Sequence, residues 1–420
     1  MVPPQSPNPS NRPPRVLFHV QHLLGIGHVM RATALARAMA EAGIAVTVTS
    51  GGFPVPGADF GPVDFHQLPP MKAADATFKA YVTEGDAPAG KAFLEARRDR
   101  LIALADQVQP DVLMMEMFPF GRRVNRTELL PLIDHLRTKG CRIVCSVRDI
   151  LVRKVKPGRD LEMIDIADRL IHLVLIHGDP ALVRFEDTLP PAGKIKPPRL
   201  YTGLVTRTNP SPQTAEPGAA LDGTGEVLVS AGGGATGLPL FNAALEARSL
   251  CAKAGRLPWR LLVGYRTGDE DFAALQAKAQ RLHGEAVIVE RARGDFPALI
   301  ERAALSISQA GYNTVMDVIR ARCPAVICPF DEAGENEQPF RAELLAKRGV
   351  VHLIHHPPGV AALAEAVEAR LAAGPSEIAL DLEGAPRAAV LIRRLAEGAE
   401  PSDLPDLAAF PPEALTMKPQ

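Results

Sequence analysis

The sequence has little of what several classes of protein require. Its 420 residues include only five cysteines, scattered and without a CxxC pair, which argues against a disulfide framework and a structural zinc site. Its 47 basic and 48 acidic residues leave a net charge of −1, so no overall positive field would hold nucleic acid. No run of eighteen uncharged apolar residues occurs, so no membrane-spanning helix is expected. We therefore expect a cytoplasmic protein without a nucleic-acid partner.

What is present is the composition of a globular protein, 46% apolar and 23% charged, and long enough for two domains. Residues 1–14 are rich in proline and are expected to form a disordered tail. Strand-like runs alternate with helical segments over 15–205 and again over 226–375, which is typical of parallel sheets. The stretch 206–225, rich in Pro, Gly, Thr and Ser, is interpreted as a linker. We expect 376–420 to supply C-terminal helices that pack back on the first domain, followed by a tail.

The predicted fold class is therefore α/β, with two doubly wound, Rossmann-like domains facing across a cleft. In sheets of this kind, ligands bind outside the carboxyl ends of the strands. Polar residues and glycines that directly follow the predicted strands are therefore the candidate site residues.

The first candidate loop lies between the first strand and the first helix. It contains Gly25, Gly27, His28 and Arg31 in the order GxGHxxR. Glycines let a ligand approach the backbone, a helix N-terminus favours an anion, and a histidine can act as a general base near neutral pH. The alternative is a helix-capping loop with a packed histidine. The order of strand, loop and helix favours the functional interpretation.

Further polar residues follow later strands of the first domain. Glu116, Arg148 and Asp149 are candidate acid–base groups or acceptor contacts, although pairing with their neighbours is an equally strong alternative. Basic residues also gather over 142–159, where solvation is the ordinary interpretation. The minority interpretation is contact with an anionic acceptor, or with anionic lipid headgroups at the inner membrane surface.

Glycines mark the corresponding turn of the second domain. Gly232, Gly233 and Gly234, followed by Thr236, separate a strand from a helix. Consecutive backbone N–H groups in such a turn form a nest that suits a diphosphate. No Gly-Lys-Ser/Thr follows, so this is not a Walker loop. We interpret the turn as a phosphate site; the alternative is a merely flexible loop.

A second turn of this domain contains Gly311, Asn313, Thr314 and Asp317. Asn313 or Thr314 could simply cap the following helix. Alternatively, Gly311 makes a second phosphate nest, and the Asp317 carboxylate accepts hydrogen bonds from ribose hydroxyls.

The stretch 308–342 reads S-x-x-G-x-x-T-x-x-D, then x-P-x-x-x-x-P, then Q-x-x-x-A. It resembles the donor-binding signature of glycosyltransferase family 28, enzymes of the GT-B fold that include the MurG-type N-acetylglucosaminyltransferases. The glycine loop 231–237 resembles the phosphate loop of that family, and 25–31 resembles its N-terminal loop. The likeness covers about 15–375.

The resemblance implies a role for each donor-site residue. Gly311 and Thr314 would contact the diphosphate, Asp317 would hold the ribose where the family usually has Glu, Glu337 and Gln338 would contact the donor sugar, and the backbone near Arg293 would face the base. His28 would lie at the reaction centre as general base or oxyanion stabiliser.

The expected function is metal-independent transfer of a sugar from a nucleotide diphospho-sugar, UDP-linked in our expectation. The acceptor would be a sugar, a lipid-linked molecule or a small molecule, and no cofactor is expected because the nucleotide sugar is a substrate. The GxGHxxR loop is closer to the nucleotide-sugar hydrolase of pseudaminic acid synthesis, so a hydrolase or epimerase is the first alternative. A non-catalytic protein that binds a nucleotide sugar is the second.

Overall fold

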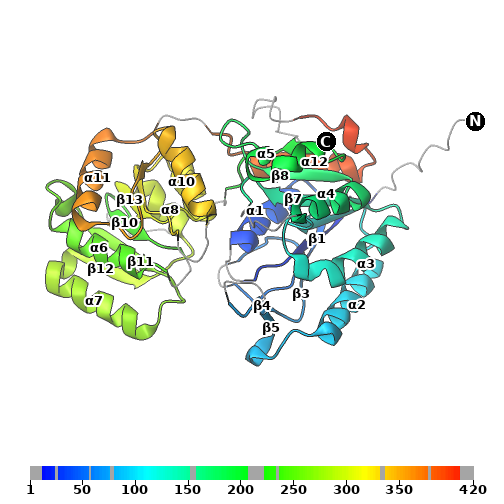
Figure 1. Ribbon diagram of the computed structural model, residues 1–420, viewed down its shortest axis with the longest axis horizontal. Helices are drawn as coiled ribbons and strands as arrows, with labels where there is room; N and C mark the ends of the chain where they lie inside the picture. Colours follow the sequence, from blue (N-terminus) through cyan, green and yellow to red (C-terminus); the bar gives the residue numbers. More distant parts are fainter. Residues whose placement is uncertain are drawn as a thin grey trace, which may run out of the picture. The chain divides into compact units, whose positions relative to one another are not determined.

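The computed structural model describes residues 12–23, 27–55, 58–75, 80–151, 158–206, 222–232, 236–331, 336–376 and 380–406. The chain divides into two compact units (Figure 1). Unit 1 comprises Met1–Leu24, His28–Val205 and Glu383–Gln420, and unit 2 comprises Gly25–Gly27 and Thr206–Leu382. Most of the expected tail and linker, and the basic residues of 152–157, lie outside the described residues.

Unit 1 is built on a seven-stranded sheet in the order β3-β2-β1-β6-β7-β8-β9, with every neighbouring pair parallel. The strands are β1 (Arg15–Val20), β2 (Ala45–Ser50), β3 (Asp64–Gln67), β6 (Val112–Glu116), β7 (Arg142–Arg148), β8 (Leu173–His177) and β9 (Arg199–Tyr201). A separate antiparallel hairpin pairs β4 (Lys72–Ala73) with β5 (Tyr81–Val82). The helices are α1 (Gly27–Glu41), α2 (Lys91–Val108), α3 (Arg126–Arg137), α4 (Arg159–Leu170), α5 (Phe185–Thr188) and α12 (Gly384–Ala396).

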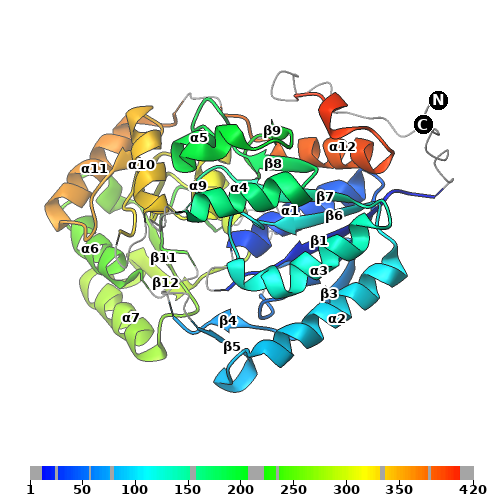
Figure 2. The same ribbon diagram turned by 45° about the vertical axis from the view of Figure 1, so that its right-hand side comes forward.

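Helices cover both faces of this sheet, because successive residues of a strand point to opposite faces. Val16 and Phe18 of β1 pack in one core with α1 and α12, whereas Leu17 packs in the other with α2, α3 and α4. The central strands are therefore buried on both sides, which is why they are nearly continuous apolar runs. Figure 2 shows α12 beside this sheet although it lies near the end of the chain. The chain returns to unit 1 where Glu383 pairs with Val205.

Unit 2 has a six-stranded sheet in the order β12-β11-β10-β13-β14-β15, again parallel throughout. Its strands are β10 (Val227–Ser230), β11 (Trp259–Val263), β12 (Val287–Arg291), β13 (Leu305–Ser308), β14 (Ala325–Ile327) and β15 (His352–Leu353). Its helices are α6 (Leu238–Arg248), α7 (Asp269–His283), α8 (Phe296–Arg302), α9 (Tyr312–Arg320), α10 (Glu337–Lys347) and α11 (Val360–Ala373). The only tryptophan of the sequence, Trp259, is fully buried and donates its indole N–H to Ala254 O at 2.9 Å.

The prediction of two doubly wound α/β domains is confirmed, and both sheets have the same topology. In each, the first strand lies next to the fourth sheet strand in chain order, so the winding reverses between β1 and β6 in unit 1 and between β10 and β13 in unit 2. Ligands of such sheets bind at this reversal, outside the carboxyl ends of the strands. The topology therefore defines one switch point in each unit.

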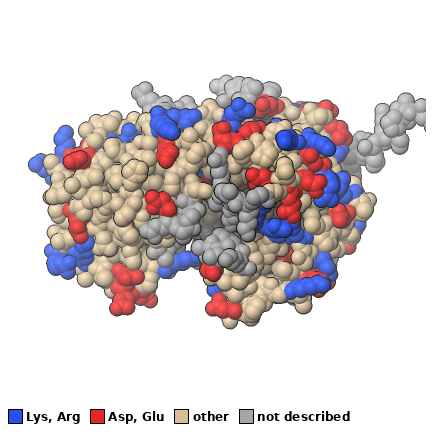
Figure 3. All heavy atoms as spheres, viewed as in Figure 1, with Lys and Arg blue, Asp and Glu red and all other residues tan. Residues whose placement is uncertain are grey.

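The surface carries charges of both signs. On the face of the molecule shown in Figure 3, Lys and Arg side chains are interspersed with Asp and Glu. Within the described part of the chain, no helix is both long and apolar enough to cross a membrane.

Candidate functional site

The switch point of unit 1 holds a histidine, a glutamate and an arginine in contact. His28 lies in the first turn of α1, and Glu116 is the last residue of β6. His28 Nδ1 lies 3.0 Å from Glu116 Oε1. Arg31, one turn further along α1, forms an ion pair with the same oxygen. His28 is 9% exposed and Glu116 and Arg31 are each 2% exposed, so the predicted residues form one buried cluster. Gly27 begins α1, and Gly25 lies outside the described residues.

A chain of buried polar side chains continues behind Glu116. Ser146 Oγ donates to Glu116 Oε2 at 2.9 Å and lies 2.8 Å from His177 Nε2. His177 Nδ1 in turn lies 2.8 Å from Thr202 Oγ1. Ser146, His177 and Thr202 are fully buried and come from or directly follow β7, β8 and β9, whose carboxyl ends are adjacent. Sequence reasoning did not assign them a role, although a polar residue at the end of a buried apolar strand was the available signal.

Electrostatics keep His28 neutral. Burial lowers its pKa well below the usual 6.5, and the positive charges of Arg122, Arg148 and Arg31 lower it further. Burial and the charge of Arg148 also lower the pKa of Arg122 to about 10. A neutral imidazole carries one N–H. Because an ionised carboxylate can only accept, His28 Nδ1 donates to Glu116 and the lone pair remains on Nε2. Arg31, whose Nη2 lies 3.3 Å from His28 Nδ1, donates to the carboxylate instead.

A second buried ion pair fixes the loops beside this cluster. The guanidinium of Arg97 donates to Glu128 at 2.5 Å, to Gly51 O at 2.9 Å and to Gln21 Oε1 at 2.8 Å. Arg97 and Glu128 are fully buried. A Cβ on Gly51 would lie 2.0 Å from Gln21 Oε1, and one on Gly52 would lie 2.2 Å from the His22 ring. The two glycines therefore let the loop after β2 pack against the segment after β1, which sequence reasoning missed.

The other two candidate residues of unit 1, Arg148 and Asp149, make different contacts. Arg148 ends β7, and its charge acts on His28. Asp149 is 1% exposed, accepts a hydrogen bond from the Ile150 N–H at 2.9 Å, and packs against Gly178. The carboxylate of Asp149 thus contacts its own loop, and its contact with an acceptor stays a prediction.

The switch point of unit 2 is made of backbone and neutral side chains. Gly232 has a left-handed φ of +68° with open space around its Cα, while Gly233 and Gly234 lie outside the described residues. Gln309, just after β13, donates from Nε2 to Thr236 O at 3.2 Å and accepts from Thr236 Oγ1 at 3.4 Å. This amide therefore joins the loops that follow β10 and β13.

Helix α9 begins at the second of these loops. Gly311 is its N-cap residue and has no side chain with which to cap the helix. Asn313 and Thr314 are half-buried inside the first turn and not at the N-cap position, so the alternative in which one of them is the N-cap residue is wrong. The first N–H groups of a helix have no partner within the helix. Asp317, in the second turn, is 2% exposed.

The remaining donor-site candidates contact neighbouring loops. Glu337 forms a buried ion pair with Arg341 at 2.6 Å, and Arg341 donates to Ala310 O at 3.2 Å, just before Gly311. Gln338 Oε1 accepts from the Phe330 N–H at 3.3 Å. The guanidinium of Arg293 pairs with Asp295 and Asp222, both at 2.7 Å, which fixes the start of α8. The ion pair of Glu337 and Arg341 and the side chain of Gln338 thus contact the segments that follow β13 and β14, whereas Arg293 pairs with Asp222, which precedes β10.

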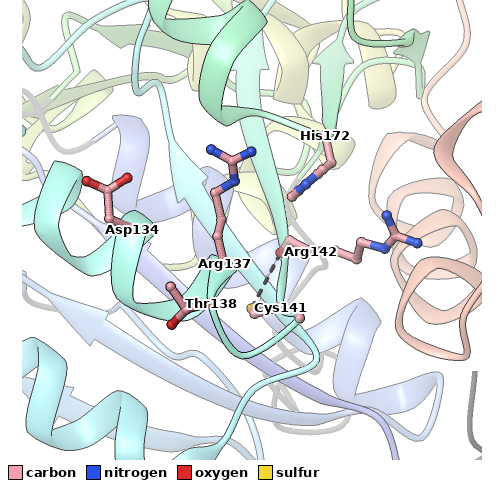
Figure 4. Close-up of a pocket in the computed structure, with 7 residues that line it drawn as sticks. Asp134, Arg137, Thr138, Cys141, Arg142 and His172 are labelled. Atoms are coloured by element: carbon pink, nitrogen blue, oxygen red, sulfur yellow. Dashed lines mark hydrogen bonds between the residues drawn. The ribbon is translucent and has the colours of Figure 1, made fainter.

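A cavity in the described part of unit 1 lies away from the switch point. It measures about 650 Å³ and opens at the amino end of β7, between the end of α3 and the residue before β8. Figure 4 shows Arg137, Arg142 and His172 around it. It lies at the opposite end of β7 from Ser146, so it is not part of the switch point.

The second unit matches a known family. Residues 228–372 match the model of the glycosyltransferase family 28 C-terminal domain. The UDP-N-acetylglucosamine–N-acetylmuramyl-(pentapeptide) pyrophosphoryl-undecaprenol N-acetylglucosamine transferase of Synechococcus sp. strain CC9605 is 29% identical over 177 residues, which cover 41% of this chain and 46% of that protein. The transferase of the same name from strain CC9902 is 32% identical over 80 residues, 19% and 22% of the two chains. The chain thus spans less than half the length of these relatives.

Solved structures show the same fold over nearly the whole chain. MurG of Acinetobacter baumannii has a TM-score of 0.55 at 15% identity and covers 91% of this chain and 100% of its own. A UDP-glucosyltransferase of Polygonum tinctorium has a TM-score of 0.59 at 13% identity, covering 92% and 99%. Both units therefore have the fold of GT-B glycosyltransferases.

Proposed function

We propose that the protein is a glycosyltransferase that moves a sugar from a nucleotide diphospho-sugar, UDP-linked, to a hydroxyl-bearing acceptor without a metal ion. One observation carries the proposal. The part of the chain that matches the family 28 domain has a left-handed glycine and a helix with a glycine N-cap at the switch point of its sheet. Exposed backbone N–H groups of this kind bind phosphate oxygens.

The donor binds unit 2 in this proposal. N–H groups near Gly232 and in the first turn of α9 bind the diphosphate and stabilise the negative charge that develops as it departs. Asp317 accepts from the ribose hydroxyls, and Gln338 contacts the donor sugar. The pairing of Glu337 with Arg341 positions the loop of Gly311 in addition to any contact with the sugar.

The acceptor binds unit 1, where His28 is the general base. As the acceptor oxygen bonds to the anomeric carbon and the bond to the diphosphate oxygen breaks, the acceptor proton passes to His28 Nε2. Glu116, which already accepts from Nδ1 at 3.0 Å, stabilises the resulting imidazolium. The charges of Arg122 and Arg148 beside His28 favour an acceptor that is itself negatively charged.

The donor site is tested by two matched substitutions in unit 2. Gly311 and Gly359 are both N-cap residues in extended conformation, with φ and ψ of −60° and 138° and of −70° and 135°. Aspartate is a favourable N-cap residue, so Gly311→Asp and Gly359→Asp should each keep or slightly raise stability. At position 311, however, the carboxylate would occupy and repel the diphosphate site.

Binding of UDP, GDP and their sugars is measured by calorimetry and thermal shift, with and without EDTA. A ligand at 100 times its dissociation constant should stabilise the protein by about 2.7 kcal/mol. We expect one nucleotide sugar to bind the wild type and Gly359→Asp equally, with EDTA present, and to bind Gly311→Asp at least tenfold more weakly. Equal binding to both variants would refute the donor site. Full-rate release of free sugar without any acceptor would indicate a hydrolase, and tight binding without turnover would indicate a binding protein.

A further inference from the structure

Three buried side chains behind Glu116 have no part in the function proposed above. Ser146, His177 and Thr202 are fully buried, and each lies within 2.9 Å of the next polar group in the chain. Hydroxyl groups and a neutral imidazole each carry one hydrogen for donation. The number of hydrogens available therefore determines the direction in which this chain of hydrogen bonds runs.

The ring of His177 is neutral, because burial lowers its pKa to about 3 and Arg31 acts in the same direction against the opposing effect of Glu116. Its single N–H is on either Nδ1 or Nε2. If it were on Nδ1, it would donate to Thr202. Ser146 would then face two acceptors, His177 Nε2 at 2.8 Å and Glu116 Oε2 at 2.9 Å. One hydroxyl hydrogen cannot serve both, so a buried acceptor would be left unsatisfied, which is costly.

With the hydrogen on Nε2, each side chain of the chain has a partner. Thr202 donates to His177 Nδ1 at 2.8 Å, which is closer than its other acceptors, Gly203 O at 3.1 Å and Ile176 O at 3.4 Å. His177 Nε2 then donates to Ser146, and Ser146 donates to Glu116 Oε2. The other oxygen, Oε1, accepts from His28 Nδ1 and from Arg31. Both carboxylate oxygens of Glu116 thus accept hydrogen bonds.

We infer that Ser146, His177 and Thr202 form a one-way hydrogen-bond chain that holds Glu116 as an acceptor and thereby fixes His28 in the Nδ1–H tautomer. Ser146 and His177 are positioning residues, because they act on the reacting group only through Glu116. The tautomer of His177 follows from the hydrogen-bond geometry of a neutral ring and does not depend on the proposed function. Its effect on turnover rests on the proposed function.

The tautomers are measured directly on the full-length wild-type protein by ¹⁵N NMR of its histidine rings at pH 7. We expect His177 to carry its hydrogen on Nε2 and His28 on Nδ1. A His177 resonance with the hydrogen on Nδ1 would overturn the inference, whatever the protein catalyses. This measurement needs no substitution, so it does not depend on a variant that folds.

The effect on chemistry is tested by replacing His177 with two amides of different reach. The side-chain nitrogen of His177→Gln can take the place of Nε2 and donate to Ser146, whereas that of His177→Asn reaches only the place of Nδ1. We expect His177→Gln to retain turnover within about threefold and His177→Asn to lose at least tenfold in kcat with unchanged donor KM. The acid limb of the pH profile should shift in His177→Asn. The other ionisable groups that face His28 are Arg31, Arg122, Arg148, His22 and Glu116, and both variants retain them.

The two amide variants distinguish a role of His177 in positioning Glu116 from a role in stabilising the fold. Equal loss in His177→Gln and His177→Asn, at equal loss of thermal stability, would overturn the positioning role. A wild type without transferase turnover would refute the proposed function, and the tautomers of His177 and His28 would still decide the hydrogen-bond chain.

Discussion

The two units have the same strand order, yet their switch points are filled by opposite chemistry. In unit 1, ionisable side chains are buried and joined to one another through Glu116, with His28 at the edge. In unit 2, the corresponding position has a left-handed glycine, a helix with a glycine N-cap and a neutral amide, Gln309, that joins two loops. In the function proposed above, the first site accepts a proton and the second binds a diphosphate through backbone N–H groups. The same sheet topology would then serve two different chemical tasks.

The largest expected effect is on turnover and belongs to unit 1 alone. His28→Ala should lower kcat by about 10²–10⁴-fold, the range for loss of a general base, while nucleotide binding by unit 2 remains unchanged. Steady-state kinetics and calorimetry with the donor measure the two effects separately. His66→Ala, on an exposed strand edge, is the control and should behave like wild type. If turnover of His28→Ala stays within a few-fold of wild type, His28 is not the general base, and the proposed chemical difference between the two switch points is wrong.

Acidification should destabilise unit 1. The pKa values of His19 and His177 are lowered to about 3 by burial, whereas unfolded histidine titrates near 6.5. Below pH 6.5 the unfolded chain therefore binds protons that the fold excludes, and stability falls progressively toward pH 3. By pH 5 the loss is about 2 kcal/mol for each of the two histidines, with a further contribution from His28.

Hydrogen exchange during urea unfolding at pH 7 and pH 5 assigns this loss to a unit. The amides of β1, β7 and β8 should lose protection at the lower pH. The control is His19→Asn, in which the pH-dependent loss should shrink by the contribution of His19, about 2 kcal/mol at pH 5. Unchanged protection of these strands at pH 5 would contradict the prediction.

The next effect concerns close packing in unit 2. A Cβ on Gly237 would lie 2.4 Å from the Cβ of Ala231 and 2.6 Å from the Phe241 ring. Gly237→Ala should therefore cost about 1–3 kcal/mol of stability and displace the loop that follows β10. Gly294→Ala, with nothing within 4 Å of the new Cβ, should stay within about 0.5 kcal/mol of wild type. Thermal unfolding of the two variants gives the comparison, and equal melting temperatures would contradict it.

The smallest effect on stability is expected at the hydrogen bonds between Thr236 and Gln309, which join the loops after β10 and β13. Thr236 is exposed, and its hydroxyl lies 3.4 Å from Gln309 Oε1, so Thr236→Val should cost no more than about 1 kcal/mol. Donor affinity measured by calorimetry should change less than fivefold. A loss of a hundredfold would mean that unit 2 depends on a side-chain contact as strongly as unit 1 does.

The sequence predicted most of the fold because long apolar runs and helical spacing determine the central elements. The strand β1, the helix α1 and the strand–turn–helix around Gly311 follow directly from such patterns. The short edge strand β9 and the hairpin of β4 and β5 were not predicted. Elements of two or three residues are too short to show a period, and tertiary pairing decides them.

The candidate site was predicted as individual residues, and not as a network. His28, Arg31 and Glu116 were named, but their contact depends on β6 pairing with β1 across almost a hundred residues of chain. His177 was not assigned a role, because a histidine at a strand end does not reveal its neighbours. Asp149 was named beside Arg148, but its hydrogen bond with the N–H of Ile150 depends on coordinates that the sequence does not give.

The return of the chain to unit 1 at Glu383 has a consequence for synthesis on the ribosome. Leu391 and Ile392 of α12 belong to the same core as Val16 and Phe18 of β1, so this core is completed only after all of unit 2 has been translated. Unit 2, whose segment from Thr206 to Leu382 is nearly continuous, has its complete sheet available earlier. The nascent chain should therefore form unit 2 first, while unit 1, which contains His28, waits for its last helix.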